Sequence, residues 1–288
     1  MSKKSITPVP EFEALLPQEY RDLVANGPYG GDKSVADLGT FKEIIESHPH
    51  CAGCGVALGL RLALASLPNP ADTIVIGTPG CSFFGLAQTA VNYSNTAFGN
   101  QNAVASGLTR MLRLRFPDAP KDVVVMVGDG AVADIGLDYT LHSWFRGEHF
   151  TTIMLDNEVY ANTGGQESGM SKQGDVLNMA PTGKSFQKIP IFEMAKTAGC
   201  AYVARVTVAS PRKLGDVVRK AIRLAREVGP TYVQMFTPCP TNLKFAPGNT
   251  VATARAAEKT HYAFEEYLTP DAQACLERMA AAPTGGHP

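Results

Sequence analysis

Short apolar, β-branched runs alternate along the chain with amphipathic segments of helical length. Such runs, bounded by Gly, Pro, Asp or Asn, are typical of buried strands, and the longer segments are typical of helices packed on a sheet. The expected strands are Thr73–Gly77, a run from Val123 to the Gly128-Asp129-Gly130 turn, Thr151–Leu155, Tyr202–Val206 and Thr231–Phe236. The expected helices are Gly55–Leu67, Gly99–Arg113, Ile135–Arg146, Phe192–Ala198 and Ser210–Arg226, with Ser210 as the N-cap of the last. This alternation predicts an α/β fold with a doubly wound, mostly parallel sheet.

Both ends of the chain differ from the alternating core. Residues 1–40 are rich in Pro, Gly and charge and predict an extended N-terminal arm that packs on another surface, such as a partner subunit. Residues 41–245 are the expected core domain. Residues 246–288 are a polar C-terminal tail with one amphipathic helix near Asp271 to Ala281. Within the core, the Gly-, Ser- and Lys-rich residues 167–188 predict a loop over the functional site.

Composition restricts the class of protein further. With 288 residues, of which 44% are hydrophobic and 18% charged, the chain has the composition of a soluble globular protein and can bury a full-sized core. A net charge of −1 gives no general attraction to nucleic acid or to an anionic membrane. The N-terminus lacks the apolar core of a signal peptide, and no apolar run approaches the ~18 residues of a spanning helix. We therefore expect a cytoplasmic protein whose cysteines are thiols or metal ligands rather than disulfides.

Two of the expected strands end in residues that suit a ligand site. The strand from Val123 ends at Gly128-Asp129-Gly130, and the strand from Thr151 ends at Asp156-Asn157, with 26 residues between Gly130 and Asn157. In an open α/β sheet, ligands bind at the carboxyl edge of the strands. The sequence therefore predicts that an acid, an amide and several glycines meet at one edge.

These groups suit a divalent metal that holds a diphosphate. Mg²⁺ takes oxygen ligands and is commonly shared between carboxylates and substrate phosphates. Asp129 offers a carboxylate, Asn157 a neutral carbonyl oxygen, and the following chain a backbone carbonyl, which we assign to Val159.

The glycines of the first turn suit the phosphates themselves. Gly128 and Gly130 let the backbone approach them, and the helix that starts beyond Ala131 aims amide N–H groups at them. A lone Gly-Asp-Gly is more often only a tight turn. The second strand end, with Asn157 at the right distance, favours the diphosphate site.

Four cysteines form a second group of candidate ligands. Cys51-Ala52-Gly53-Cys54 places two thiols one turn apart, Cys81 follows the first strand in a Pro-Gly loop, and Cys239 lies between two prolines after the last strand. Strand ends at the same edge can bring all four together. Four thiolates suit a [4Fe–4S] cluster or a structural Zn²⁺, and the spacing does not separate these two. Cys200 and Cys275 are interpreted as small buried or half-buried residues without an assigned role.

The Gly-Asp-Gly, 26-residue, Asn spacing resembles the thiamine diphosphate motif of thiamine-dependent enzymes. The longer strings GDGAVADIG and DNEVYANTGGQ resemble the β subunits of the 2-oxoacid:ferredoxin oxidoreductases, and the likeness covers roughly residues 45–245. It implies the thiamine diphosphate-binding (PP-type) fold, with Asp129, Asn157 and the Val159 carbonyl on Mg²⁺. It further implies that Gly128, Gly130 and Ala131 lie near the diphosphate, with Asp134 and Thr163 as additional contacts and Asn162 facing the substrate carboxylate or the reactive carbon of the cofactor.

The same resemblance implies a redox function. In it, Cys51, Cys54, Cys81 and Cys239 match the ligands of a proximal [4Fe–4S] cluster. The implied reaction is oxidative decarboxylation of a 2-oxoacid to acyl-CoA and CO₂, with coenzyme A as co-substrate and electrons passing through the cluster to ferredoxin or another acceptor. Zn²⁺ has no accessible redox step and cannot replace the cluster in this role.

The resemblance also implies partner subunits. Thiamine enzymes need a carboxylate at the aminopyrimidine, which belongs to a pyrimidine-binding domain for which this chain has no room. We expect that domain in an α subunit, further clusters in γ and δ subunits, and no activity from this chain alone. The segment Tyr93–Gly99, which lacks tryptophan, suggests a substrate bulkier than pyruvate, such as the aryl 2-oxoacid phenylglyoxylate; pyruvate remains the alternative.

Two rival functions share part of these features. A non-redox thiamine lyase or synthase subunit would use the Asp129–Asn157 site and a structural zinc, and a non-catalytic metal-binding module would need only the cysteines. The histidines His48, His50 and His142 are interpreted as loop, packing or surface residues. Gly164-Gly165 fits either a closing loop or a simple turn.

Overall fold

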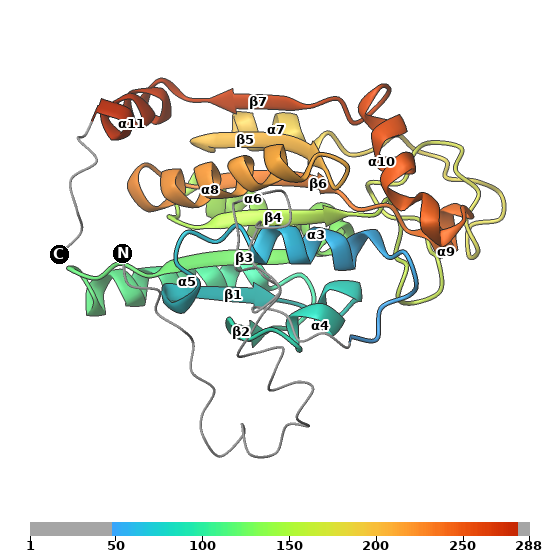
Figure 1. The fold of residues 1–288 in the computed structure, drawn as a ribbon, viewed down its shortest axis with the longest axis horizontal. Helices are drawn as coiled ribbons and strands as arrows, with labels where there is room; N and C mark the ends of the chain where they lie inside the picture. Colours follow the sequence, from blue (N-terminus) through green and yellow to red (C-terminus); the bar gives the residue numbers. More distant parts are fainter. Residues whose placement is uncertain (1–47, 282–288) are drawn as a thin grey trace, which may run out of the picture.

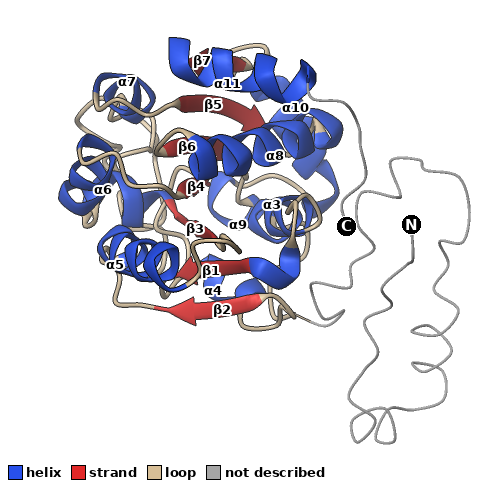
Figure 2. Cartoon of the chain, turned by 90° about the vertical axis from the view of Figure 1, so that its left-hand side faces the viewer, coloured by secondary structure: helices blue, strands red, loops and turns tan. Residues whose placement is uncertain are grey.

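The computed structural model describes residues 48–281, which form a seven-stranded sheet with helices on both faces (Figures 1 and 2). The strand order is β2-β1-β3-β4-β6-β5-β7, and every neighbouring pair is parallel except β5 and β7. The strands are β1 (Thr73–Gly77), β2 (Asn92–Asn95), β3 (Asp122–Gly128), β4 (Thr151–Asp156), β5 (Tyr202–Thr207), β6 (Thr231–Phe236) and β7 (Glu265–Leu268). The predicted doubly wound, mostly parallel sheet is confirmed.

The helices divide between the two faces of the sheet (Figure 2). One face carries α5 (Gln101–Arg115), α6 (Leu137–Phe145) and α7 (Ile191–Thr197). The other carries α3 (Gly55–Leu64), α8 (Pro211–Glu227), α10 (Thr250–Glu258) and α11 (Pro270–Ala281). The short helices α4 (Cys81–Leu86) and α9 (Pro240–Leu243) directly follow β1 and β6, so they lie at the carboxyl edge of the sheet.

The central strands are buried on both faces, which explains their uninterrupted apolar sequences. In β3, Val124 and Met126 pack into the core on one side of the sheet, whereas Val123, Val125 and Val127 pack into the core on the other. Helices cover both faces, so a parallel strand at the centre has no solvent-facing positions and shows no alternation of polar residues.

Three local features differ from the expectations. The Pro-Gly loop after β1 continues into the short helix α4, and the polar, largely exposed segment NYSN forms the edge strand β2. An edge strand that is not buried carries no apolar pattern by which to recognise it. Ser210 does precede α8, but its hydroxyl donates to Glu258 at 2.8 Å instead of capping the helix.

The described part of the C-terminal tail belongs to the same sheet. β7 pairs with β5 in antiparallel register, and the tail residue Tyr262 is fully buried with its ring stacked on Phe236 at 4.6 Å between centroids. The Tyr262 hydroxyl donates to Asp156 at the end of β4. The tail helix expected near Asp271 to Ala281 is α11. The expected arm of residues 1–40 lies outside the described residues, and no helix within 48–281 is both long and apolar enough to cross a membrane.

We predict that Tyr262→Ala destabilises the protein strongly, because it removes a buried aromatic ring that joins the tail to the sheet. The expected loss in the free energy of unfolding is about 3–5 kcal/mol, measured by denaturant unfolding. Met279→Ala, an exposed change in the same tail, should stay within about 0.5 kcal/mol. Equal, small effects of the two substitutions would show that the tail does not contribute to the core.

Candidate functional site

The strand register brings the two predicted ligand turns together. Gly128 of β3 pairs with Leu155 of β4, so the turns that follow them leave the sheet side by side at its carboxyl edge. A cavity of about 130 Å³ opens there. Its walls include most of the site residues predicted from the sequence: Cys81, Gly128, Asp129, Gly130, Asn157, Val159, Asn162 and Thr163.

Asp129 is the acidic residue in the wall of this cavity. Its side chain is buried, and the Ser168 hydroxyl donates to its Oδ2 at 2.6 Å. Burial raises the pKa of Asp129 well above its usual range, and repulsion by Asp156 adds to the effect. A buried carboxylate that is held by one hydroxyl and the backbone N–H of Gly130, with no ion-pair partner among residues 48–281, favours either a proton or a bound cation. The donor set therefore fits a metal ion.

The second turn holds its residues in an unusual backbone conformation. Glu158 has φ of 61°, the left-handed region that non-glycine residues seldom adopt. Asn157 is buried and its Oδ1 accepts the Val159 N–H at 3.3 Å. Strained residues of this kind persist only where their surroundings hold them, and they cluster at functional sites.

The glycines of the first turn have separate roles. A Cβ on Gly128 would meet nothing within 4 Å, so this position leaves open space beside the cavity. A Cβ on Gly130 would lie 2.3 Å from the ring of Tyr160, so the position of this ring leaves space only for a glycine at residue 130. The turn continues through the five-residue π-helical segment Gly130–Asp134 into α6.

Three predicted contacts point elsewhere in the structure. Asp134 lies outside the cavity wall, and its carboxylate accepts the backbone N–H of Gly169 at 2.9 Å. Ala131 is completely buried and also absent from the wall. Thr163 does line the cavity, but its hydroxyl donates to Gln166 at 2.7 Å.

The cysteines gather near the same edge. The N–H of Gly55 donates to the Pro238 carbonyl at 3.2 Å, which holds the Cys51–Cys54 loop against the end of β6 beside Cys239. Burial raises the pKa of Cys81 to about 12, and the charges that Cys54, Cys239 and Cys51 carry as thiolates add to this rise.

The four cysteines are near enough for the charges of Cys54, Cys239 and Cys51 to act on Cys81. Among residues 48–281, no group of three or more His, Cys, Asp or Glu side chains is arranged to hold one metal ion. Cys200 and Cys275 are buried in the two cores, as expected.

Sequence reasoning missed the residues behind the cavity. Ser168 touches Asp129, and the lysines Lys184 and Lys188 are held inside the segment that was expected to be only a loop over the site. Nothing in their spacing marks them, because their partners are backbone carbonyls and carboxylates that only the fold brings near.

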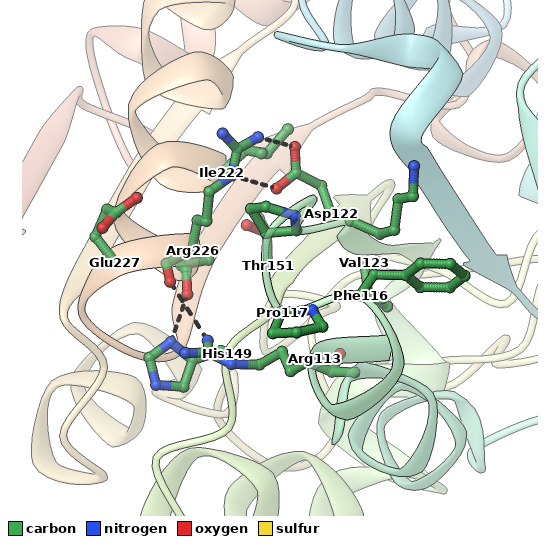
Figure 3. A pocket seen from close by; sticks show the side chains of 14 residues that line it. Arg113, Phe116, Pro117, Asp122, Val123, His149, Thr151, Ile222, Arg226 and Glu227 are labelled. Atoms are coloured by element: carbon green, nitrogen blue, oxygen red, sulfur yellow. Dashed lines mark hydrogen bonds and ion pairs between the residues drawn. The ribbon is translucent and has the colours of Figure 1, made fainter. Parts of the chain in front are cut away.

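A larger cavity, of about 360 Å³, lies at the opposite, amino-terminal edge of β3 and β4 (Figure 3). Its arginines have partners already: Arg226 donates to both oxygens of Asp122, at 3.0 and 2.6 Å. Arg113 and His149 hydrogen-bond to carbonyls at the end of α8. It lies away from both glycine turns, so we place the site in the smaller cavity.

The chain is similar to known proteins along most of its length. The family model described as thiamine pyrophosphate enzyme, C-terminal TPP binding domain, matches residues 76–235. Pyruvate synthase subunit PorB of Methanothermobacter marburgensis is 35% identical over 226 residues, which cover 74% of this chain and 75% of that protein. Ketoisovalerate oxidoreductase subunit VorB of Pyrococcus abyssi is 32% identical over 232 residues, which cover 75% of this chain and 72% of that protein.

A solved structure shows the same fold. It is a 2-oxoglutarate:ferredoxin oxidoreductase from Magnetococcus marinus with 2-oxoglutarate, coenzyme A and succinyl-CoA bound. The likeness has a TM-score of 0.64 and covers 90% of this chain and 94% of that chain at 22% sequence identity.

We predict that Asp129→Asn stabilises the metal-free chain. The substitution keeps the shape of the side chain and removes a buried charge, so the free energy of unfolding at neutral pH should rise by about 1–3 kcal/mol. Denaturant unfolding in the presence of a chelator measures the change. Asp138→Asn, an exposed change on α6, serves as the control and should have little effect. A less stable Asp129→Asn protein would contradict the electrostatic description of the site.

Proposed function

The chain belongs to the β subunits of the 2-oxoacid:ferredoxin oxidoreductases, a thiamine pyrophosphate-binding family, and on this premise we propose that its β3–β4 edge holds the cofactor of an oxidative decarboxylation. The proposed reaction converts a 2-oxoacid to acyl-CoA and CO₂. The observation that carries the proposal is the pairing of Asp129 with Asn157 in one cavity, with Cys81 in the same wall.

The residues present fit a magnesium diphosphate. We propose that Asp129, Asn157 and the Val159 carbonyl bind Mg²⁺, because the buried Asp129 carboxylate requires a compensating cation. Gly128, Gly130 and the start of the helical segment beyond them are proposed to approach the diphosphate. The cavity has a volume of about 130 Å³, whereas pockets that enclose a whole ligand usually have at least roughly 300 Å³. The small volume supports the proposal that this chain binds only one end of the cofactor.

When bound, thiamine diphosphate supplies the carbon that adds to the 2-oxoacid and accepts the electrons of the bond that breaks. The task of this chain is to bind and orient. Asn162 lines the cavity and is exposed, so its amide is proposed to donate to the substrate carboxylate. The apolar side chains Val56, Phe98 and Leu155 form part of the same cavity wall.

We further propose that Cys51, Cys54, Cys81 and Cys239 ligate a [4Fe–4S] cluster. A four-iron cluster distributes its thiolates over four separate atoms, so they stand farther apart than the ligands of one ion. A tetrahedral Zn²⁺ would also take four thiolates, but it has no accessible redox step, so the proposed oxidation favours the cluster. The cluster would pass electrons to ferredoxin or another acceptor.

The remaining walls of the site are proposed to come from an α subunit that carries the pyrimidine-binding domain, with γ and δ subunits holding further clusters. Exposed apolar side chains near the cavity support a covering partner. Ile135, 62% exposed, follows the turn that begins with Gly130, and Tyr139, 47% exposed, lies one turn further along in α6. Met179, 59% exposed, lies beside Gly164 in the loop after Asn162.

The substrate is proposed to be a 2-oxoacid whose side chain is larger than that of pyruvate, with phenylglyoxylate as one example. The segment Tyr93–Gly99 contributes Phe98 to the cavity wall, whereas Tyr93 lies on the edge strand β2 with its hydroxyl on Asn95 at 2.9 Å. Phe98 is thus the aromatic ring that this segment contributes to the cavity wall. We propose that the space beside it accommodates a larger acyl or aryl group of the substrate.

We predict that Cys81→Ser removes the cluster from the anaerobically purified complex. Iron and labile sulfide should each fall by about four atoms per copy of this chain relative to the wild-type complex, together with part of the visible absorbance that dithionite bleaches. Cys200→Ser, a buried cysteine outside the group, is the control and should retain both. A colourless wild-type complex with stoichiometric zinc would rule out the cluster.

We predict that the complete complex turns over a bulky 2-oxoacid with kcat/KM at least ~10-fold above that for pyruvate, the difference that one or two methylene-sized contacts supply. Acceptor reduction with pyruvate, 2-oxoisovalerate, 2-oxoglutarate and phenylglyoxylate measures it. The isolated chain should show no turnover with any of them. Strict preference for pyruvate would contradict the larger pocket, and native rates from the chain alone would contradict the shared site.

A further inference from the structure

A buried ammonium group lies behind the cavity and is not explained by binding or chemistry. Lys184, in the segment 167–188, is 2% exposed and has no carboxylate partner within hydrogen-bond distance. Instead its Nζ donates to three backbone carbonyls, those of Ser168 at 2.6 Å, Gly169 at 3.0 Å and Ser171 at 2.8 Å. An ammonium has three protons to donate, so Lys184 commits all of them to one four-residue turn.

That turn contacts both halves of the metal site. The Ser168 hydroxyl donates to Asp129, and the Ser171 hydroxyl donates to the backbone carbonyl of Glu158, the residue between Asn157 and Val159. A third contact, from the Gly169 N–H to Asp134, fixes the turn to the segment that follows Gly130.

The turn is also rigid within itself. Ser168, Met170 and Ser171 are each at most 1% exposed. The Ser168 N–H donates to the Ser171 hydroxyl at 2.9 Å, and the Met170 N–H donates to the Ser168 hydroxyl at 3.1 Å. Without the ammonium, the buried turn would lose three hydrogen bonds: the Ser168 and Gly169 carbonyls would keep only the N–H donors of Ser171, at 3.1 Å, and Ile189, at 2.9 Å, and the Ser171 carbonyl would lose the Lys184 donor, which is costly.

We propose that Lys184 is a positioning residue for the metal site: its ammonium closes the turn 168–171, and the turn sets the spacing between Asp129 and the strained Glu158 backbone. This inference rests on the proposed function, since it assigns the metal to Asp129 and Asn157. The segment 167–188 is therefore a fixed support behind the site rather than only a loop above it.

The test compares Mn²⁺ binding, measured by electron paramagnetic resonance in the presence of thiamine diphosphate, across variants of the complete complex. Lys184→Met keeps the length of the side chain and removes the ammonium, and should weaken Mn²⁺ binding about 10–100-fold, the range for partners that orient metal ligands. Ser168→Ala should cause a loss in the same range. Lys196→Met, a partly exposed lysine on α7 paired with Glu193, is the control and should bind like wild type.

The double variant separates positioning from general loss of structure. Because Lys184 acts through the turn, Lys184→Met combined with Ser168→Ala should weaken binding little more than either change alone. Hydrogen exchange at residues 168–171 should rise in Lys184→Met and stay at the wild-type level in Lys196→Met.

Three results would overturn the inference. If Lys184→Met binds Mn²⁺ within twofold of wild type, Lys184 has no part in positioning. Fully multiplicative losses in the double variant would show independent action. If Lys184→Met does not fold, wild-type affinity in Ser168→Ala would exclude a positioning role for the turn. Failure of the wild-type complex to bind Mn²⁺ with thiamine diphosphate would instead refute the proposed function, and the inference with it.

Discussion

Two buried carboxylates stand next to each other where β3 and β4 end, and their charges must be compensated. The in-register pairing of Gly128 with Leu155 places Asp129 beside Asp156, and repulsion between them raises the pKa of Asp129 beyond the effect of burial. Asp156 has its compensation within the chain, from Lys188 at 3.3 Å and from the donors of Gln234 and Tyr262. Asp129 has the Ser168 hydroxyl and the Gly130 N–H but no ion-pair partner among the described residues, so the carboxylate that faces the cavity is the one left for a cation.

The compensation of Asp156 explains why distant segments converge on this edge. Lys188 pairs both with Asp156 and, at 2.9 Å, with Glu158. Burial raises the pKa of Glu158, but the hydrogen bond to His261 and the charges of Lys188 and Lys172 lower it to about 2. Tyr262 and His261 come from the tail, and Lys188 from the segment after the second turn. A tail that seemed separate in sequence is thus part of the arrangement behind the site.

The sequence was sufficient where a physical pattern is local. The apolar runs predicted β1, β3, β4, β5 and β6, because a strand buried on both faces has no polar positions, and the spacing of Gly130 and Asn157 predicted that the two turns meet. Prediction from the sequence failed where a residue's structure depends on partners that are distant in the sequence. The edge strand β2 has no apolar pattern, and the Ser210 hydroxyl found Glu258 instead of its own helix. The role of Lys184 depends on three carbonyls that no spacing rule relates to it.

The central claim is that the β3–β4 edge binds a divalent cation through Asp129 and Asn157 and, through that cation, the diphosphate of the cofactor. The most direct measurement is anomalous diffraction from crystals of the complete complex grown with Mn²⁺ and thiamine diphosphate. The account predicts one anomalous peak at this edge, about 2.0–2.2 Å from oxygens of Asp129, Asn157 and the Val159 carbonyl and of the diphosphate. Bound thiamine diphosphate with the peak elsewhere, or with no peak between the two turns, would contradict it.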